Sequence, residues 1–135
     1  MKERIKIIIA DDNIGFCDLL KKFLEKNEDI EILGLAHTDD EEIKQIEELK
    51  PEIVITDLMR NHKYTGLHII EEYMKRDKHP EFLIISADKK EDTISTNIKI
   101  GGYIEKPFFD YDSIIQELRR IKEEINIYKE KNDNA

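Results

Sequence analysis

The stretch IKIIIADD at residues 5–12 decides the fold. Its isoleucine run is continuous rather than alternating with polar residues, which is typical of a β-strand covered on both faces. Two aspartates, Asp11 and Asp12, follow where the apolar run stops. A third, Asp57, ends a second apolar run, and Lys106-Pro107 closes another. Charged side chains at the ends of short hydrophobic segments indicate one metal-and-phosphate site rather than scattered surface charges.

Apolar runs alternate along the chain with segments of helical periodicity. Strands are predicted at 5–10, 30–36, 53–56, 82–85 and 102–105, and helices at 14–27, 39–50, 66–75, 91–100 and 111–129. This alternation predicts an α/β fold, a doubly wound five-stranded parallel sheet of order 2-1-3-4-5 flanked by five helices. Ligands bind such sheets beyond the carboxyl ends of strands 1 and 3, where Asp11, Asp12 and Asp57 stand.

Composition narrows the class of protein. The 135 residues suit a single domain, and the formal net charge of -9 disfavours nonspecific binding to nucleic acid or anionic membranes. Cys17 is the one cysteine, so no internal disulfide forms, and we expect it in the core. The apolar run at the start is too short for a signal peptide or membrane span, so we expect a cytoplasmic protein.

The chemistry of the strand ends follows from repulsion. Three carboxylates held close together need a neutralising partner, and Mg²⁺ prefers a few carboxylates, water and a phosphate oxygen. A carboxylate beside Mg²⁺ can attack phosphorus and form an aspartyl phosphate. Lys106 would share the charge of the transferring group, and Ser86 would offer it a hydroxyl. Taken singly, each of these residues also fits a helix cap or a turn.

The chain resembles the response-regulator receiver domains of two-component signalling, a flavodoxin-like fold, over residues 4–128. The motifs that carry the resemblance are IIIADDN at 7–13, IVITD at 53–57, IISA at 84–87 and GYIEKPF at 102–108. The resemblance implies Asp57 as phosphoacceptor from a histidine kinase. It also implies a Mg²⁺ site in which Asp12 and Asp57 bind directly, Asp11 binds largely through water, and Met59 contributes its backbone carbonyl.

The same resemblance assigns the switch. Ser86 and Lys106 would contact the phosphoryl group, and Tyr103 would reorient as Ser86 moves. The Lys106-Pro107 bond matches a position that is typically cis in the family. Phosphorylation adds about -1.5 to -2 charge units, which would raise an active-like population and change the face of helix 4, strand 5 and helix 5.

The chain departs from the family pattern in two places. Arg60 and Asn61 stand where Met-Pro is usual, and Gly66 lies nine residues after Asp57 rather than eight. The basic residues Arg60 and Lys63 could steer a phosphorylated donor, but we expect a solvated loop. Between Ser86 and Lys106 the chain is about two residues short, which predicts a short or irregular helix 4. Met59 and Asp88 occupy positions that tune phosphoryl lifetime.

Other polar features have plainer interpretations. The histidines show no shared metal spacing and are expected at the surface or in loops; they are His37, His62, His68 and His79. The Glu-Glu runs at 41–42, 47–48 and 123–124 are expected on solvated helix faces. The last helix carries a heptad stripe that ends in Ile125 and Tyr128. Its end packs either on its own core or against a second chain, as in a homodimer, or a following domain.

We therefore predict a receiver domain at 1–128 with a polar tail at 129–135. It is not an enzyme in the usual sense, because it catalyses only its own phosphotransfer and dephosphorylation. The expected partners are a sensor histidine kinase or phosphotransfer protein and a downstream effector, with no direct nucleic-acid binding and no membrane. The alternatives are an interaction module that acts without phosphorylation and the receiver fragment of a longer transcriptional regulator. An aspartyl phosphatase is disfavoured, because Met59 stands where such enzymes place a second aspartate.

Overall fold

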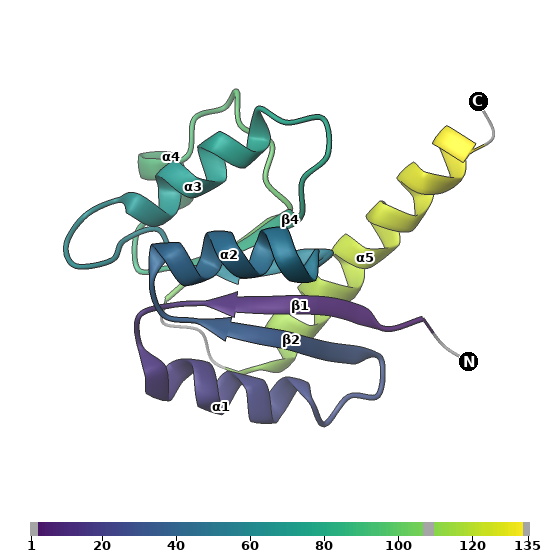
Figure 1. Ribbon diagram of the computed structural model, residues 1–135, viewed down its shortest axis with the longest axis horizontal. Coiled ribbons are helices and arrows are strands. Elements are labelled where there is room, and N and C mark those ends of the chain that lie inside the picture. The colour runs from purple at the N-terminus through teal and green to yellow at the C-terminus, as the bar shows by residue number, and fades with distance from the viewer. Residues whose placement is uncertain (1–2, 107–109, 134–135) are drawn as a thin grey trace.

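A computed structural model describes residues 3–106 and 110–133 (Figure 1). Its strands pair in parallel in the order β2-β1-β3-β4-β5, which confirms the predicted sheet. In chain order the elements are β1 (Ile5–Ala10), α1 (Ile14–Leu24), β2 (Ile30–Ala36), α2 (Asp39–Leu49), β3 (Ile53–Thr56), α3 (Thr65–Met74), β4 (Glu81–Ser86), α4 (Lys90–Thr93), β5 (Gly102–Glu105) and α5 (Asp112–Asp133).

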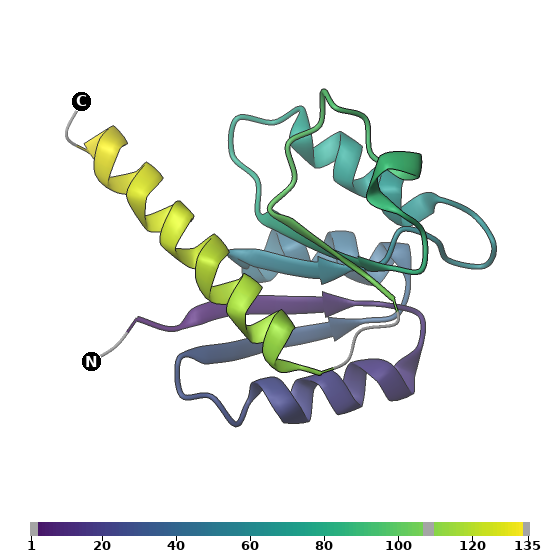
Figure 2. The same cartoon turned by 180° about the vertical axis from the view of Figure 1, so that it is seen from behind.

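Two apolar clusters cover the two faces of the sheet. Along β1, Ile7 and Ile9 pack with α1 and α5, whereas Ile8 packs with α2 and α3. Figure 1 shows α2 in front of the sheet, and Figure 2, from behind, shows α5 crossing the opposite face. Cys17 is fully buried in the α1 cluster, as predicted. This double coverage explains why the strands of the sheet centre are continuous apolar runs.

The helix predicted at 91–100 is shorter than its pattern suggested. It begins at Lys90 and ends at Thr93, so it forms a single turn, in agreement with the expectation of a short or irregular helix 4. The Thr93 hydroxyl donates to the Lys89 carbonyl oxygen at 3.1 Å, and the Asn97 backbone N–H donates to Ser95 Oγ at 3.2 Å. Such local hydrogen bonds give the backbone an alternative to a longer helix.

Helix α2 turns a different face to the core than its apolar residues predicted. Ile43, Ile46 and Leu49 recur at helical spacing, which predicts that they point inward, but Ile43 and Leu49 are each 41% exposed. Ile46 is buried, and Glu42, one turn before it on the same face, is fully buried. The prediction that the Glu41-Glu42 pair lies on a solvated face is therefore wrong for Glu42.

Helix α5 covers the sheet with its first half and continues past it. Ile114, Leu118 and Ile121 are buried, while Tyr128 is 67% exposed. The helix reaches Asp133, beyond the predicted end near Lys129, and its last turns extend away from the sheet (Figure 2). No helix in the described part of the chain is long and apolar enough to cross a membrane.

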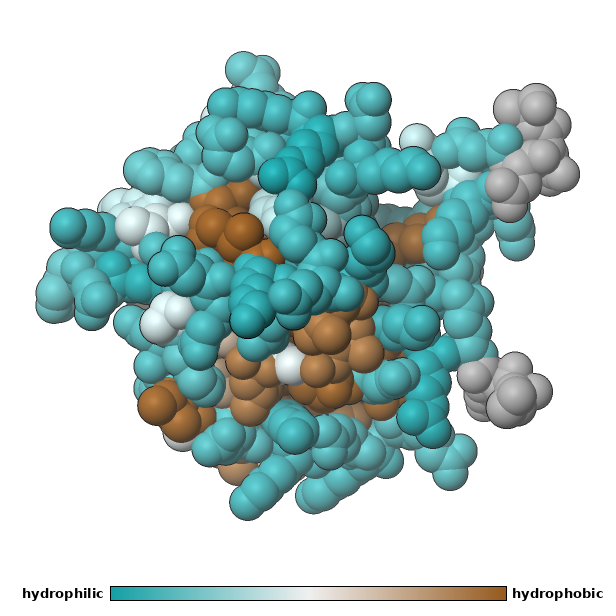
Figure 3. All heavy atoms as spheres, viewed as in Figure 1, coloured by the Kyte–Doolittle hydropathy of each residue, from teal (hydrophilic) through white to brown (hydrophobic). Residues whose placement is uncertain are grey.

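The surface is mostly hydrophilic, as the high content of charged residues requires. Figure 3 shows this for the face that carries α2, with an apolar patch where the edge strand β2 runs. The inner residues of β2, 31–35, are only half-buried. The outer edge of the sheet is thus less covered than its centre.

Candidate functional site

The acidic site lies where β1 and β3 end side by side. Ala10 pairs with Thr56 in the parallel ladder, so the next residues, Asp11 and Asp57, are brought together. Asp11, Asp12 and Asp57 each offer a carboxylate oxygen, and these atoms all lie within 4.8 Å of one another. The predicted gathering of the acidic trio is confirmed. Asp11 and Asp57 are buried, whereas Asp12 is exposed to solvent.

Burial raises the pKa values of the Asp11 and Asp57 carboxylates. It raises the pKa of Asp57 to about 6, with a further rise from the negative charge of Asp11. Burial likewise raises the pKa of Asp11, against the hydrogen bond that the backbone N–H of Asn13 donates to it. An excess of carboxylate oxygens at one buried point fits a hard divalent cation, and Mg²⁺ takes such ligands. Asp11, Asp12 and Asp57 are the residues that would hold it.

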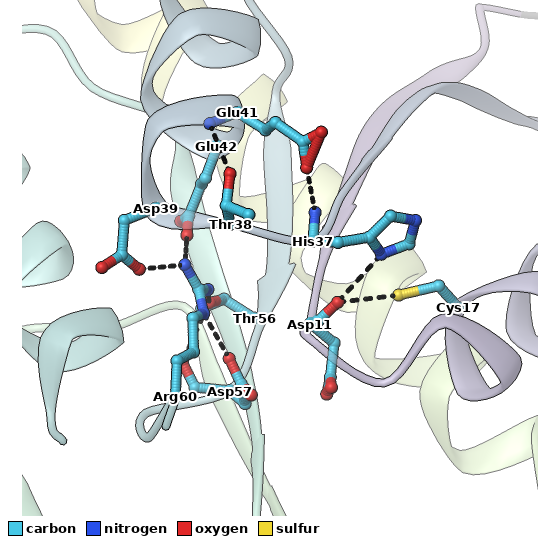
Figure 4. A network of polar contacts seen from close by, with 10 residues as sticks. All are labelled: Asp11, Cys17, His37, Thr38, Asp39, Glu41, Glu42, Thr56, Asp57 and Arg60. Atoms are coloured by element: carbon cyan, nitrogen blue, oxygen red, sulfur yellow. Dashed lines mark hydrogen bonds and ion pairs between the residues drawn. The ribbon is translucent and has the colours of Figure 1, made fainter. Parts of the chain in front are cut away.

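Arg60 is buried against Asp57, which the sequence did not predict. We expected it in a solvated loop, but its side chain is only 5% exposed. Its Nε donates to Asp57 Oδ1 at 2.9 Å, and its Nη2 donates to Thr56 Oγ1 at 2.8 Å. Its Nη1 donates to Asp39 Oδ1 at 2.8 Å. Figure 4 shows Asp57 between this guanidinium and the Asp11 carboxylate.

Glu42 completes the surroundings of the guanidinium. Its Oε1 lies 2.6 Å from Arg60 Nη1, and the side chain is fully buried. Burial raises the pKa of Glu42 to about 7, although the charge of Arg60 opposes this rise. Burial lowers the pKa of Arg60, but the charges of Glu42 and Asp57 outweigh it and raise that pKa overall. The guanidinium therefore stays charged among more carboxylates than it can neutralise.

The unusual loop after Asp57 is a tight two-residue turn. The backbone N–H of Arg60 donates to the Lys63 carbonyl oxygen at 2.8 Å, and that of Lys63 donates back at 3.0 Å. Asn61 and His62 both have positive φ, at 51° and 61°, as a type I′ turn requires. This turn replaces the proline of the family pattern. It directs Arg60 inward and leaves Lys63 exposed.

Gly66 brings the first turn of α3 into contact with the backbone of Asp57 and Leu58. A Cβ at this position would collide with the backbone carbonyl oxygen of Asp57 and lie 3.0 Å from that of Leu58. The backbone N–H of Leu67 donates to the Leu58 carbonyl oxygen at 3.2 Å. A glycine is needed here because of this close approach, not because of its φ angle.

A pocket of about 410 Å³ opens beside Arg60. It lies between the loops that follow β1, β2 and β3, and its wall includes Asp12, Thr38, Arg60 and Lys63. Acidic and basic groups therefore both face the entrance to the site.

The remaining predicted site residues lie at the carboxyl ends of β4 and β5. Ser86 is buried, and its Oγ accepts from the backbone N–H of Asp88 at 3.1 Å. Lys106 Nζ lies 5.0 Å from the centre of the Phe16 ring, and its charge lowers the pKa of Asp11. The Tyr103 hydroxyl donates to the Asp88 carbonyl oxygen at 2.8 Å.

Two further predictions have a different outcome. Met59, whose carbonyl was expected as a metal ligand, has a side chain at the surface, and its ligand role stays a prediction. The cis bond predicted at Lys106-Pro107 lies outside the described residues.

A family model shows to which family this chain belongs. The model of the response regulator receiver domain matches residues 7–119. The chain belongs to the response regulator receiver domain family. Receiver domains of this family are typically non-enzymatic modules of two-component signalling, and a histidine kinase is the partner that the family implies. An acidic trio of this kind is typical of the Mg²⁺ site of receiver domains.

Solved receiver structures share the fold at low sequence identity. The receiver domain of the Francisella response regulator 1452 aligns with a TM-score of 0.78 and 22% identity, over 90% of this chain and 99% of that one. The response regulator domain of Thermotoga maritima CheB gives 0.75 and 18%, over 88% and 96%. RcsB from Salmonella enterica serovar Typhimurium, bound to promoter rprA with the phosphomimetic BeF3⁻, gives 0.76 and 22%, over 90% of this chain. This receiver spans 61% of the RcsB chain.

Proposed function

We propose that this receiver accepts a phosphoryl group on Asp57 from a phosphohistidine of a kinase or phosphotransfer protein. The single observation that carries the proposal is the buried carboxylate of Asp57, with a pKa raised to about 6, beside Asp11 and Asp12. A perturbed carboxylate at a strand end is a marker of chemical function. Its surroundings can take up a cation and, with it, a phosphate.

The residues of the chain divide the chemistry between them. An Asp57 oxygen forms the new P–O bond while the P–N bond of phosphohistidine breaks, and the imidazole leaves with a proton from solvent. Bound Mg²⁺ would supply charge neutralisation for the phosphoryl oxygens. Lys106 reaches the site from the α1 side, above Phe16, and Ser86 offers a hydroxyl from the end of β4.

The switch uses the loop after β4. Ser86 Oγ holds the Asp88 backbone N–H, and Tyr103 holds the Asp88 carbonyl oxygen, so one residue links both side chains. A phosphoryl group that draws in the Ser86 hydroxyl competes with its bond to Asp88. The loop then shifts, Tyr103 loses its hydrogen bond to Asp88, and the face formed by α4, β5 and α5 changes for a downstream partner.

Intact-mass analysis after incubation with acetyl phosphate and Mg²⁺ tests the proposal. We expect one added phosphoryl group on the wild-type chain and none on Asp57→Asn. Asp18→Asn, which changes an exposed aspartate on α1, is the matched control and should still be modified. Failure of the wild-type chain to gain mass would contradict the proposal.

A second function is favoured by one observation. Arg60 already occupies Asp57 Oδ1, so the receiver could act as an interaction module without phosphorylation. In that case the acetyl phosphate experiment gives no added mass, and the Asp57→Asn chain binds its partner as the wild-type chain does. Phosphorylation of the wild-type chain excludes this alternative.

A further inference from the structure

We propose that Arg60 is a phosphoryl-binding residue: once Asp57 is phosphorylated, the buried guanidinium holds the phosphoryl oxygens. This inference rests on the proposed function of Asp57. It assigns to Arg60 a contact with the reacting group that neither the motif pattern nor the family match provides. The geometry that carries it is the contact of Nε with Asp57 Oδ1 at 2.9 Å.

The guanidinium is held in place by groups other than the acceptor. Nη1 contacts Glu42 and Asp39 at the start of α2, and Nη2 contacts Thr56 at the end of β3. None of these contacts is made to Asp57. Nε is therefore aimed at the acceptor by a fixed frame, and a donor oriented in advance needs no reorganisation when charge arrives.

Phosphoryl transfer to Asp57 shifts negative charge from the carboxylate to the phosphoryl oxygens, which stay close to Arg60. In the free protein, Nε faces a carboxylate. In the acyl phosphate, the carboxyl group is part of a mixed anhydride, and the charge lies on the adjacent phosphoryl oxygens. Guanidinium groups form short, charge-assisted hydrogen bonds with phosphate. Because the carboxylates of Asp11, Asp12 and Asp57 already lie within 4.8 Å of one another, a phosphoryl dianion added here needs every available cation.

Arg60 and Lys106 would then act from two sides. Lys106 lies over Phe16, on the α1 side of the acidic trio, whereas Arg60 lies against α2 and β3. Figure 4 shows the guanidinium on the side of Asp57 that faces away from Asp11. The phosphoryl group would thus lie between the ammonium of Lys106 and the fixed guanidinium of Arg60.

Removal of the guanidinium should change metal and phosphoryl binding in opposite directions. A positive charge beside the trio disfavours a second cation, so Mg²⁺ alone should bind Arg60→Gln as tightly as the wild-type chain, or more tightly. A phosphoryl mimic should bind it more weakly. A general loss of structure would weaken both, so the opposite signs identify a direct contact.

The test is calorimetric titration of the whole chain with BeF3⁻ at saturating Mg²⁺, and with Mg²⁺ alone. We expect Arg60→Gln to weaken BeF3⁻ binding by about tenfold to a hundredfold, the range of a lost hydrogen bond to a charged group. Lys122→Gln is the matched control, since it removes another buried cation held by two carboxylates far from the acceptor. It should bind BeF3⁻ as the wild-type chain does.

Two further variants guard against misfolding. Arg60→Lys keeps a charge for Glu42 but loses the planar fork, and should weaken BeF3⁻ binding less than Arg60→Gln. The double variant Glu42→Gln/Arg60→Gln removes both buried charges together, and is compared with Glu42→Gln alone. The same weakening of BeF3⁻ binding in that pair supports the contact in a background without an unpaired buried carboxylate at position 42.

The possible failures are distinguishable. Unchanged or tighter BeF3⁻ binding by the Arg60 variants, with normal binding by the wild-type chain, overturns the inference: Arg60 would then oppose phosphorylation, while Asp57 remains the acceptor. Failure of the wild-type chain to bind BeF3⁻, together with no mass gain from acetyl phosphate, overturns the proposed function and this inference with it.

Discussion

Two buried cations occupy opposite ends of this sheet, and they differ in what surrounds them. At the amino ends of the strands, Lys122 of α5 contacts Glu3 at 2.7 Å and Glu52 at 2.5 Å. At the carboxyl ends, Arg60 contacts Asp57, Asp39 and Glu42. The Glu3 side chain is 64% exposed, whereas Glu42 is fully buried. One cluster is open to water and the other is largely closed to it.

The pKa of Glu3 in one cluster and the pKa values of Asp57 and Glu42 in the other are displaced in opposite directions. The hydrogen bond from Lys122 lowers the pKa of Glu3. Burial raises the pKa of Asp57 to about 6 and that of Glu42 to about 7, despite Arg60. The Lys122 cluster is therefore a satisfied bridge that joins α5 to the start of the sheet. The Arg60 cluster keeps unneutralised charge, which is what a site for a cation and a phosphoryl group needs.

The largest change in the free energy of unfolding should come from removing the Arg60 or the Lys122 side-chain charge. Arg60→Met leaves buried carboxylates without a partner and should lower the free energy of unfolding by about 3 kcal/mol at pH 8. Lys122→Met should lower it by only about 1 kcal/mol, because Glu3 can return to water. Urea unfolding at pH 8 measures both. Equal losses would remove the distinction between the two clusters.

Neutralising one carboxylate in each cluster should change the free energy of unfolding in opposite directions. Because the folded-state pKa of Asp57 is raised from 3.8 to about 6, the unfolded chain loses that proton first, and stability falls as pH rises from about 4 to 6. Asp57→Asn avoids this loss and should stabilise the protein by about 2 kcal/mol at pH 8, with no gain at pH 4. Its amide oxygen can still accept from Arg60.

Glu3→Gln is the counterpart at the other end. The folded-state pKa of Glu3 is lowered, so its contribution is present above the unfolded-state value of 4.5 and is lost as pH falls below it. The variant should therefore destabilise the protein at pH 8. Unfolding curves measured from pH 4 to 8 compare Glu3→Gln with Asp57→Asn. A change in the free energy of unfolding in the same direction for both would contradict the opposite pKa shifts.

Mg²⁺ should stabilise the protein by binding only at the carboxyl ends of the strands, beside the Arg60 cluster. At ten times its Kd, the ion should raise the free energy of unfolding by about 1.4 kcal/mol at pH 8. The gain should shrink as pH falls through about 6, because protons compete for Asp57. Thermal melts with and without Mg²⁺ check this. Lys122→Met should keep the gain and Asp12→Asn should lose most of it; a gain that survives in Asp12→Asn would place the ion elsewhere.

The smallest effect concerns the backbone at each end. His62, in the turn that directs Arg60, and Lys50, which caps α2 near Glu52, both have positive φ, at 61° and 49°. Glycine adopts this conformation without a steric penalty, so His62→Gly and Lys50→Gly should each stabilise the chain by about 0.5 kcal/mol. Differential scanning calorimetry is sensitive enough. A loss of stability in His62→Gly would show that the imidazole makes a contact of its own.

The sequence predicted the features that depend on short-range pattern and strand order. Continuous apolar runs predict the strands, and the predicted parallel order places Asp11 and Asp57 together. The pair of Arg60 and Glu42 was not predictable in this way, because it joins a loop to a helix face 18 positions earlier in the chain. The signal that could have revealed Glu42 is its place one turn before Ile46, on the buried face of α2.

Other differences have local causes. The predicted first helix ran to Asn27, but it ends at Leu24, where the Asn27 amide donates to the Phe23 and Leu24 carbonyl oxygens. The fourth helix is one turn long because side chains compete for its backbone. In both places a polar side chain, which a hydrophobic pattern does not register, determines where the helix ends.

Gly66 couples the acceptor to a part of the molecule outside the switch face. With no side chain between them, the peptide of Asp57 and the first turn of α3 are in direct contact, and there is no slack for one to shift past the other. The end of β3 and the start of α3 consequently move together. If Asp57 is phosphorylated as proposed, a displacement of its backbone would be transmitted to α3 as well as to the loop after β4, so one signal would reach two surfaces of the receiver.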